Sequence, residues 1–295
     1  MNLICALLLI GAWTGSTATT CAPGRFPELP RLDARTATQR QIVDKIEAGE
    51  IFVLSNLSAA GFSPALFEWG SSCSSLAANP DFNDVLVRQE YSQSATTKRW
   101  LTLQQLIDAV AQRRLTPDSP FYWAIREPET AGPEERQMDP ESSVTWDERR
   151  FELVQRLVQH SRLFPKEMLE NLRRRPEVWI SFANAGAQTH MDGHTDATIS
   201  IQLSGRKLWT VSELPHRAGA HAVEQIYGDG MCSTRGECPT KRSRQAVLTP
   251  GDAILFPPGT LHETCGQNST ELEEAGGCGL SITCEGHPVE CSLIS

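Results

Sequence analysis

Two short stretches decide how this chain folds. They read Thr189-His190-Met191-Asp192 and Gly251-Asp252-Ala253-Ile254-Leu255-Phe256-Pro257-Pro258-Gly259-Thr260-Leu261-His262. His190 and Asp192 are two residues apart, so on a strand both side chains point to the same side. His262 follows a short apolar run and a Pro-Pro-Gly turn, where another strand of the same sheet or barrel would deliver it. Two imidazoles and one carboxylate leave half of an octahedral coordination sphere open, which is typical of ferrous iron sites that carry out oxygen chemistry.

The spacing within these stretches resembles that of a known superfamily. The second stretch reads G-x5-P-x-G-x2-H, which resembles the second signature of the cupin barrel. The pair His190-x-Asp192, with Gly205-Arg206-Lys207 following, resembles the JmjC branch of that superfamily. The resemblance covers most of residues 36–285, although only the segments that carry the ligands are specific. It implies a mainly β fold with N-terminal helices, built on a cupin-type double-stranded β-helix, or jelly-roll, barrel.

The resemblance also implies an activity and roles for five residues. Enzymes of this branch are dioxygenases that use Fe(II) as cofactor and 2-oxoglutarate as co-substrate. By resemblance, His190, Asp192 and His262 are the metal ligands and the catalytic residues. Lys207 lies where the family places the lysine that binds the far carboxylate of 2-oxoglutarate. A buried carboxylate needs such a fixed cation, because an unpaired buried charge is costly.

Two positions depart from the family pattern. The residue three before the first ligand is usually Thr and is Ala187 here, and the residue ten after it, often Asn, is Ser200. Ser200 could still form a hydrogen bond to the co-substrate. Thr189 would alternate to the opposite face of a strand from His190 and does not simply replace the missing threonine. These changes affect the expected affinity for 2-oxoglutarate more than the expected affinity for iron.

A second His-x-Asp pair leaves the register of the metal ligands open. His194-Thr195-Asp196 lies on the same strand parity as His190 and Asp192. If it held the metal, Lys207 would follow the first ligand by 13 residues instead of 17. The longer spacing is the one found in the family, so we favour His190 and Asp192.

The hydrophobic pattern predicts helices first and strands last. Apolar residues at helical spacing predict helices after Thr38 and Thr102, each opened by a Thr-x-x-Gln capping box, and further helices over 146–163 and from 165 to before 176. Short apolar or alternating runs predict strands at 51–54, 121–125, 178–182, 197–203, 207–211, 246–248, 253–256 and 279–284. In the 197–203 run, Ile199, Ile201 and Leu203 occupy one face and Thr198, Ser200 and Gln202 the other. Polar, Pro- and Gly-containing loops are expected at 127–145 and 215–244.

Three parts of the chain follow from these patterns. Residues 1–18 resemble a secretory signal, with an apolar run over 3–13 and small residues at 16–18. Residues 19–175 form the helical and mixed N-terminal part of the JmjC-like domain, and 176–295 form its double-stranded β-helix core with the metal site. The apolar run over 3–13 is too short to span a bilayer comfortably, so an uncleaved anchor is the minor alternative, and no membrane span is expected after cleavage.

Cysteine usage agrees with a secreted or lumenal protein. Removing Cys5 with the signal leaves an even number of cysteines: Cys21, Cys73, Cys232, Cys238, Cys265, Cys278, Cys284 and Cys291. An even set without a Cys-x2-Cys pair favours disulfides over zinc, although the sequence leaves their connectivity open. Sequons at Asn56 and Asn268 add support for a glycoprotein. We therefore expect secretion or residence in the lumen of the endoplasmic reticulum.

Charge excludes one class of partner. The 295 residues carry a net charge of −9, and the basic runs at 173–175 and 241–244 fit solvated helix ends and loops. Nucleic acid is therefore not expected as a partner.

Three functions fit the pattern to different degrees. The first is a JmjC-like hydroxylase that acts on a protein or peptide side chain in the secretory pathway. The alternative is a catalytically inactive cupin-fold glycoprotein that binds or supports a partner, because Ala187 and Ser200 allow a loss of co-substrate binding. A cupin that uses Mn or Fe without 2-oxoglutarate would have His-x-His and a following Glu, which are missing at His190. Succinate formation that requires Fe(II) and 2-oxoglutarate distinguishes the first function from the others.

Overall fold

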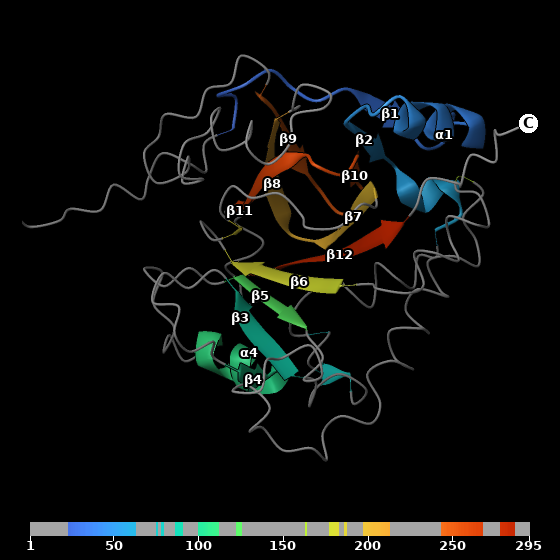
Figure 1. Ribbon diagram of the computed structural model, residues 1–295. Coiled ribbons are helices and arrows are strands. Elements are labelled where there is room, and N and C mark those ends of the chain that lie inside the picture. Colours follow the sequence, from blue (N-terminus) through green and yellow to red (C-terminus); the bar gives the residue numbers. More distant parts are fainter. Residues whose placement is uncertain are drawn as a thin grey trace, which may run out of the picture.

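The fold is known from a computed structural model, and its described part is mainly β-strand (Figure 1). The structure describes residues 23–62, 75, 78–79, 86–90, 100–111, 122–125, 163, 177–182, 186–187, 197–212, 243–267 and 278–286. The strands are β1 (Arg31–Asp33), β2 (Phe52–Ser55), β3 (Leu86–Glu90), β4 (Trp100–Thr102), β5 (Tyr122–Ile125), β6 (Glu177–Phe182), β7 (Ala197–Ser204), β8 (Arg206–Ser212), β9 (Ser243–Leu248), β10 (Ala253–Phe256), β11 (Leu261–Gln267) and β12 (Cys278–Gly286). The helices are α1 (Gln39–Glu47), the 3-10 helix η1 (Leu57–Ala60) and α4 (Leu103–Ala111).

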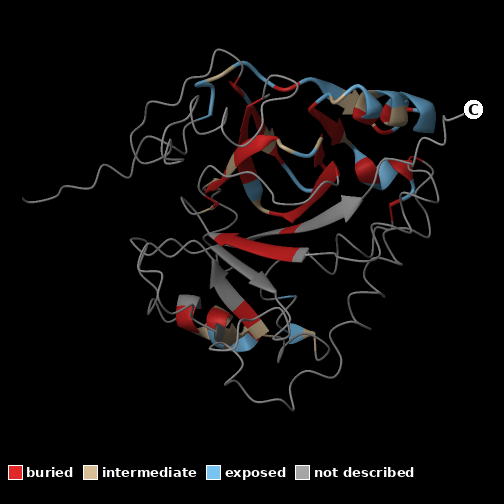
Figure 2. Ribbon diagram, viewed as in Figure 1, coloured by how far each residue is buried: buried red, intermediate tan, exposed pale blue. Residues whose placement is uncertain are grey.

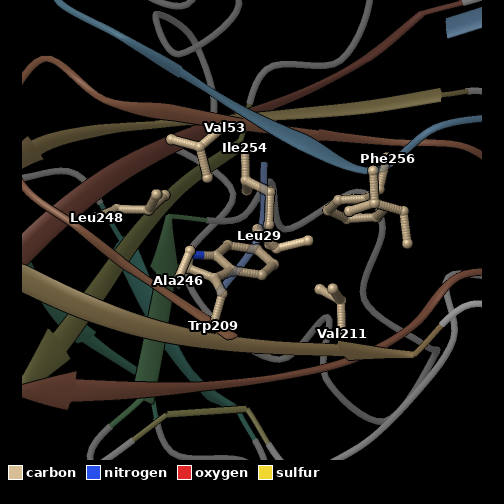
Figure 3. Packing of buried hydrophobic residues seen from close by; sticks show 9 residues of the cluster. Leu29, Val53, Trp209, Val211, Ala246, Leu248, Ile254 and Phe256 are labelled. Carbon is tan, nitrogen blue, oxygen red and sulfur yellow. The ribbon is translucent and has the colours of Figure 1, made fainter. Parts of the chain in front are cut away.

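These strands form two sheets that share one core. The larger sheet has the order β1-β2-β10-β7-β12-β6-β5-β3-β4, and the smaller has the order β11-β8-β9. Apolar side chains from both sheets meet in a cluster that we call the intersheet core: Leu29, Ile51, Val53, Trp209, Val211, Ala246, Leu248, Ile254 and Phe256 (Figure 3). Trp209 comes from the smaller sheet, and Val53 and Ile254 come from the larger one. The two sheets therefore pack face to face around this layer.

The segment before α1 joins the two sheets along one side. Gln245 of β9 donates its backbone N–H to Pro27 O, and Leu29 donates its own to Gln245 O, both at 2.8 Å. Farther along the same segment, Val53 of β2 donates to Pro30 O at 2.9 Å, and β1 pairs in parallel with β2. One short run of chain thus hydrogen-bonds β9, an edge strand of the smaller sheet, and β2 of the larger sheet.

The two faces of β7 are reversed relative to a usual hydrophobic core. Ser200 pairs with Ile254 of β10, which belongs to the intersheet core, so the polar face of β7 points inward. The apolar face pairs with Leu255 and Ala253 and points away from that layer. It is buried as well, since Ile199, Ile201 and Leu203 are at most 4% exposed. All eight residues of β7 are buried, and Figure 2 shows buried residues along the strands of both sheets.

Both predicted capping boxes are present. Thr38 Oγ1 accepts a hydrogen bond from Gln41 N, and Thr38 N–H donates one to Gln41 Oε1, which together start α1. Thr102 and Gln105 make the same pair of bonds at 3.1 and 2.9 Å and start α4. The helices predicted over 146–163 and 165–175 lie outside the described residues, apart from Leu163, which is buried.

The predicted strands are present, with differences at their ends. β9 begins at Ser243, three residues before the predicted start, because its backbone pairs with β8 as far as Ser212 and the two serine hydroxyls lie 2.7 Å apart. The strand β3 was not predicted, since its Leu-Val-Arg-Gln-Glu sequence lacks both alternation and a long apolar run. In the part of the chain that the structure describes, no helix is long and apolar enough to cross a membrane.

The Gly-Asp pair of the second signature forms a structural turn. Asp252 Oδ2 accepts hydrogen bonds from Thr249 N at 3.1 Å and Thr249 Oγ1 at 3.0 Å, and it pairs with Arg31 at 3.3 Å. The backbone of Gly251 and Asp252 also exchanges hydrogen bonds with Gln202 of β7. The carboxylate therefore holds the turn between β9 and β10 against its neighbours.

Asp252→Ala is expected to lower the free energy of unfolding by about 2 kcal/mol, because it leaves Thr249 N–H without its acceptor and removes the Arg31 contact. Urea denaturation would measure the change. Asp252→Asn should cost less, since it keeps a side-chain oxygen for Thr249. Equal losses in the two variants would show that the hydrogen bonds of this carboxylate do not hold the turn.

Candidate metal centre

His262 has the burial and the hydrogen bond expected of a metal-binding histidine. It lies on β11 and is 4% exposed. Its Nδ1 lies 3.0 Å from Thr260 O, and a carbonyl oxygen only accepts, so Nδ1 carries a proton, and in the neutral imidazole Nε2 then carries the lone pair. Metal-binding histidines typically donate their second N–H in this way, which fixes the tautomer and the ring orientation. The rings of Trp209 and Phe256, with centroids at 5.7 and 4.9 Å, pack against the imidazole.

His190 and Asp192 lie outside the described residues, but the chain just before them is placed. Ala187 donates its backbone N–H to Thr264 Oγ1, and Thr264 donates its own to Ala187 O, both at 3.0 Å. We call this pair of hydrogen bonds the β11 clip. Thr264 is two residues after His262, and His190 is three residues after Ala187, a span of at most about 11 Å. Ala187, the last described residue before the His-x-Asp segment, therefore lies beside the strand that carries His262.

The β11 clip depends on a glycine. A Cβ built on Gly186 would lie 1.9 Å from the backbone oxygen of Thr264 and 2.5 Å from its carbonyl carbon. Only a residue without a side chain fits there. Neither Gly186 nor Thr264 stood out in the sequence, because each acts through a contact between segments 78 residues apart.

The far end of the same segment also returns to His262. Thr198, at the start of β7, pairs with Phe256, whose ring packs against the imidazole. Ala187 and Thr198, the described residues on either side of the two His-x-Asp pairs, thus both contact neighbours of His262. His194 and Asp196 lie outside the described residues as well, so the choice of register stays a prediction.

Lys207 is a fully buried cation on the inward face of β8. It is 0% exposed, and its Nζ donates a hydrogen bond to Ser281 Oγ of β12 at 2.6 Å. Lys207 shares its face with Trp209, two residues on, and therefore points into the same layer. Burial lowers the pKa of Lys207 from 10.5 to about 7, because removal from water disfavours the ammonium.

The inward face of the larger sheet opposite Lys207 is polar. Ser200, predicted to contact the co-substrate, is 1% exposed on this face. Gln202 and Ser281 are direct cross-strand partners and are 0% and 1% exposed. Buried polar groups are normally hydrogen-bonded, and Ser281 Oγ accepts its hydrogen bond from Lys207.

The described residues show one of the three predicted ligands. Among them, no group of three or more His, Cys, Asp or Glu side chains could hold a metal ion. The imidazole of His262 fits a metal through its buried ring and its Nδ1 bond to Thr260 O. His190 and Asp192 would complete the set from the segment that the β11 clip positions.

Comparison with known proteins gives a family for this region. A family model described as the JmjC domain matches residues 152–277, which include all five predicted site residues. No curated protein matched the chain.

Proposed function

Residues 152–277 match a JmjC domain, consistent with the JmjC/cupin-like family, and on this premise we propose that the protein is a 2-oxoglutarate- and Fe(II)-dependent dioxygenase. It would hydroxylate a side chain of a protein or peptide in the secretory pathway. The proposal includes the cupin-type jelly roll, with the metal site between the two sheets.

The observation that carries the proposal is the β11 clip. It joins Ala187, three residues before His190, to Thr264, two residues after His262. Residues that are more than 70 positions apart in the sequence are thereby brought to one place, as a three-ligand site requires.

Each residue of the site has a proposed role. His190, Asp192 and His262 would hold Fe(II), with the Nδ1 bond to Thr260 O aiming the third imidazole. Iron and 2-oxoglutarate together supply the oxidising power that places one oxygen atom of O2 on a substrate C–H and the other in succinate. Lys207 would bind the far carboxylate of the co-substrate, and Ser200, on the same inward wall, would contact it through its hydroxyl. The surrounding core excludes bulk water, which strengthens these charged contacts.

The proposed compartment is supported by one cysteine. Cys265 of β11 is disulfide-bonded, which agrees with an oxidising environment. A signal over residues 1–18, release into the secretory pathway and glycosylation at Asn56 remain parts of the proposal. Asn56 is exposed, and its amide donates to Asp33 at 3.2 Å.

Anaerobic titration of the purified protein with Fe(II) and 2-oxoglutarate tests the function. The wild type should develop the weak visible charge-transfer band of the complex of protein, Fe(II) and 2-oxoglutarate. With O2 it should form succinate only when both Fe(II) and 2-oxoglutarate are present. His262→Ala should lose at least 100-fold in Fe(II) affinity, because it removes one of three protein ligands. His287→Ala removes a histidine outside residues 152–277 and is the control, so it should keep wild-type Fe(II) affinity.

The register is tested in the same titration. His190→Ala should lose iron binding and His194→Ala should keep it, whereas the reverse would assign the metal to the second pair. A wild-type protein that binds iron but gives neither the band nor succinate would favour the inactive binding or structural protein.

A further inference from the structure

The imidazole of His262 is contacted by one aromatic side chain from each of the two sheets. Trp209 lies on β8, the neighbour of β11 in the smaller sheet, and Phe256 lies on β10 of the larger sheet. The ring of Trp209 is stacked on the imidazole at an interplanar angle of 30°, and the ring of Phe256 is tilted against it at 41°. The rings of Trp209 and Phe256 also contact each other, with centroids 5.8 Å apart. We call these two residues the aromatic pair.

The register of the strands explains how the three rings meet. Trp209 is paired with Thr264, two residues along β11 from His262, so the indole and the imidazole are diagonal neighbours on one face of the smaller sheet. Phe256 reaches the same imidazole from the opposite sheet, and its backbone pairs with Thr198 of β7. The orientation of the imidazole is therefore tied to the packing of one sheet on the other.

The hydrogen bond of His262 and the aromatic pair restrain different motions of the ring. The contact between Nδ1 and Thr260 O, at 3.0 Å, fixes one edge of the imidazole. That contact alone would let the ring tilt about the line that joins the two atoms. Trp209 and Phe256 oppose the tilt, because all three ring side chains are at most 4% exposed and protein interiors are close-packed. Together these contacts fix the direction in which Nε2 points.

The indole of Trp209 has a cost in stability. In the part of the chain that the structure describes, its Nε1 is buried and has no hydrogen-bond partner. Figure 3 shows this nitrogen on the side of Ala246, the cross-strand partner of Trp209, whose side chain has no acceptor. A buried donor without an acceptor is destabilising, and an aliphatic side chain would avoid that cost. What the indole offers instead is a broad aromatic face, and the imidazole of His262 stacks on it.

We propose that Trp209 and Phe256 are positioning residues that direct Nε2 of His262 at the metal, and that iron affinity depends on their aromatic faces. The metal role of His262 rests on the proposed function, whereas the orientation of its ring by the aromatic pair does not. Each residue of the pair acts through the imidazole. Groups that orient a metal ligand in this way are typically worth roughly 10- to 100-fold in metal affinity.

NMR of the histidine rings in the metal-free protein tests the orientation first. The ring protons of His262, identified as the signals lost in His262→Ala, should lie upfield, because the imidazole stacks on the indole face. Trp209→Leu should return these signals toward the position of an exposed histidine, and Trp209→Phe should keep part of the upfield shift. His262 ring signals that stay the same in wild type, Trp209→Leu and Trp209→Phe would overturn the proposal.

Anaerobic titration with Fe(II) then tests the metal role. Trp209→Leu and Phe256→Leu should each weaken Fe(II) binding about tenfold, and Trp209→Phe should bind Fe(II) more tightly than Trp209→Leu, since it keeps an aromatic face. Phe52→Leu is the matched control, because Phe52 is 1% exposed but lies outside the intersheet core, where its ring faces Lys45. This control should lower the melting temperature as Phe256→Leu does and leave Fe(II) affinity unchanged.

The control separates positioning from a general loss of stability. If Phe52→Leu and Phe256→Leu weakened Fe(II) binding equally for the same fall in melting temperature, the positioning role would be overturned. Wild-type Fe(II) affinity in both Trp209→Leu and Phe256→Leu would overturn it as well. A wild type that binds no Fe(II) would overturn the proposed metal site, and the NMR result without metal would still decide whether the aromatic pair orients the ring.

Discussion

Gly186→Ala is expected to disconnect the His-x-Asp segment from β11. The added Cβ would lie 1.9 Å from Thr264 O, so one of the two backbones must move and the β11 clip breaks. We expect a loss of about 3 kcal/mol in the free energy of unfolding, at the upper end of single substitutions. Fe(II) affinity should fall at least 100-fold although all three proposed ligands remain. Chemical denaturation and anaerobic iron titration measure the two effects.

Gly24→Ala provides the control for this variant. A Cβ on Gly24 meets no atom within 4 Å, so only its backbone conformation at φ +82° opposes the change. That variant should keep full iron affinity. If Gly186→Ala also kept wild-type iron affinity and stability, the β11 clip would not be what positions the metal ligands.

The second large effect concerns Lys207 and pH. The folded-state pKa of Lys207 is about 7, below the unfolded value of 10.5. Between these values the unfolded chain binds a proton that the folded chain does not, so stability rises with pH by about 1.4 kcal/mol per unit. Below pH 7 the full cost of burying the ammonium is present, and above pH 10.5 it is gone.

Lys207→Met is expected to remove this dependence. A methionine fills much of the same space without a charge, so the variant should be more stable than the wild type at pH 6 and should lose that advantage as pH approaches 10. Urea denaturation from pH 6 to 10 measures the free energy of unfolding of both proteins. The titration of all other groups cancels in the difference between them. Lys45→Met, at a partly exposed lysine of α1, is the control and should leave the slope unchanged. Parallel curves for the wild type and Lys207→Met would show that Lys207 ionises normally in the folded protein.

Local sequence was enough to predict most elements of secondary structure. Thr38 and Thr102 each start a helix through contacts three residues away, and such short-range signals are readable along the chain. The period of two in β7 predicted its two faces correctly. It did not predict which face points inward, because both faces are buried and the choice depends on which of them packs against the opposite sheet.

The candidate site, like the secondary structure, could be predicted only in part from the sequence. The residue types and spacing of His190, Asp192 and His262 led to the prediction of a metal site without any structure. The β11 clip and the contact between Lys207 and Ser281 could not be predicted, since each joins segments that lie far apart in the sequence.

The sequence by itself determined the β-rich character of the chain, the positions of its helix starts and strands, and the residue types available for iron and a carboxylate. These properties depend on side-chain chemistry and on neighbours a few residues apart. Only the tertiary structure decided that a polar strand face lines the interior, that Gly186 must be without a side chain, and that Lys207 loses its ordinary pKa. Each of these depends on which distant segments pack together and on how much water that packing removes.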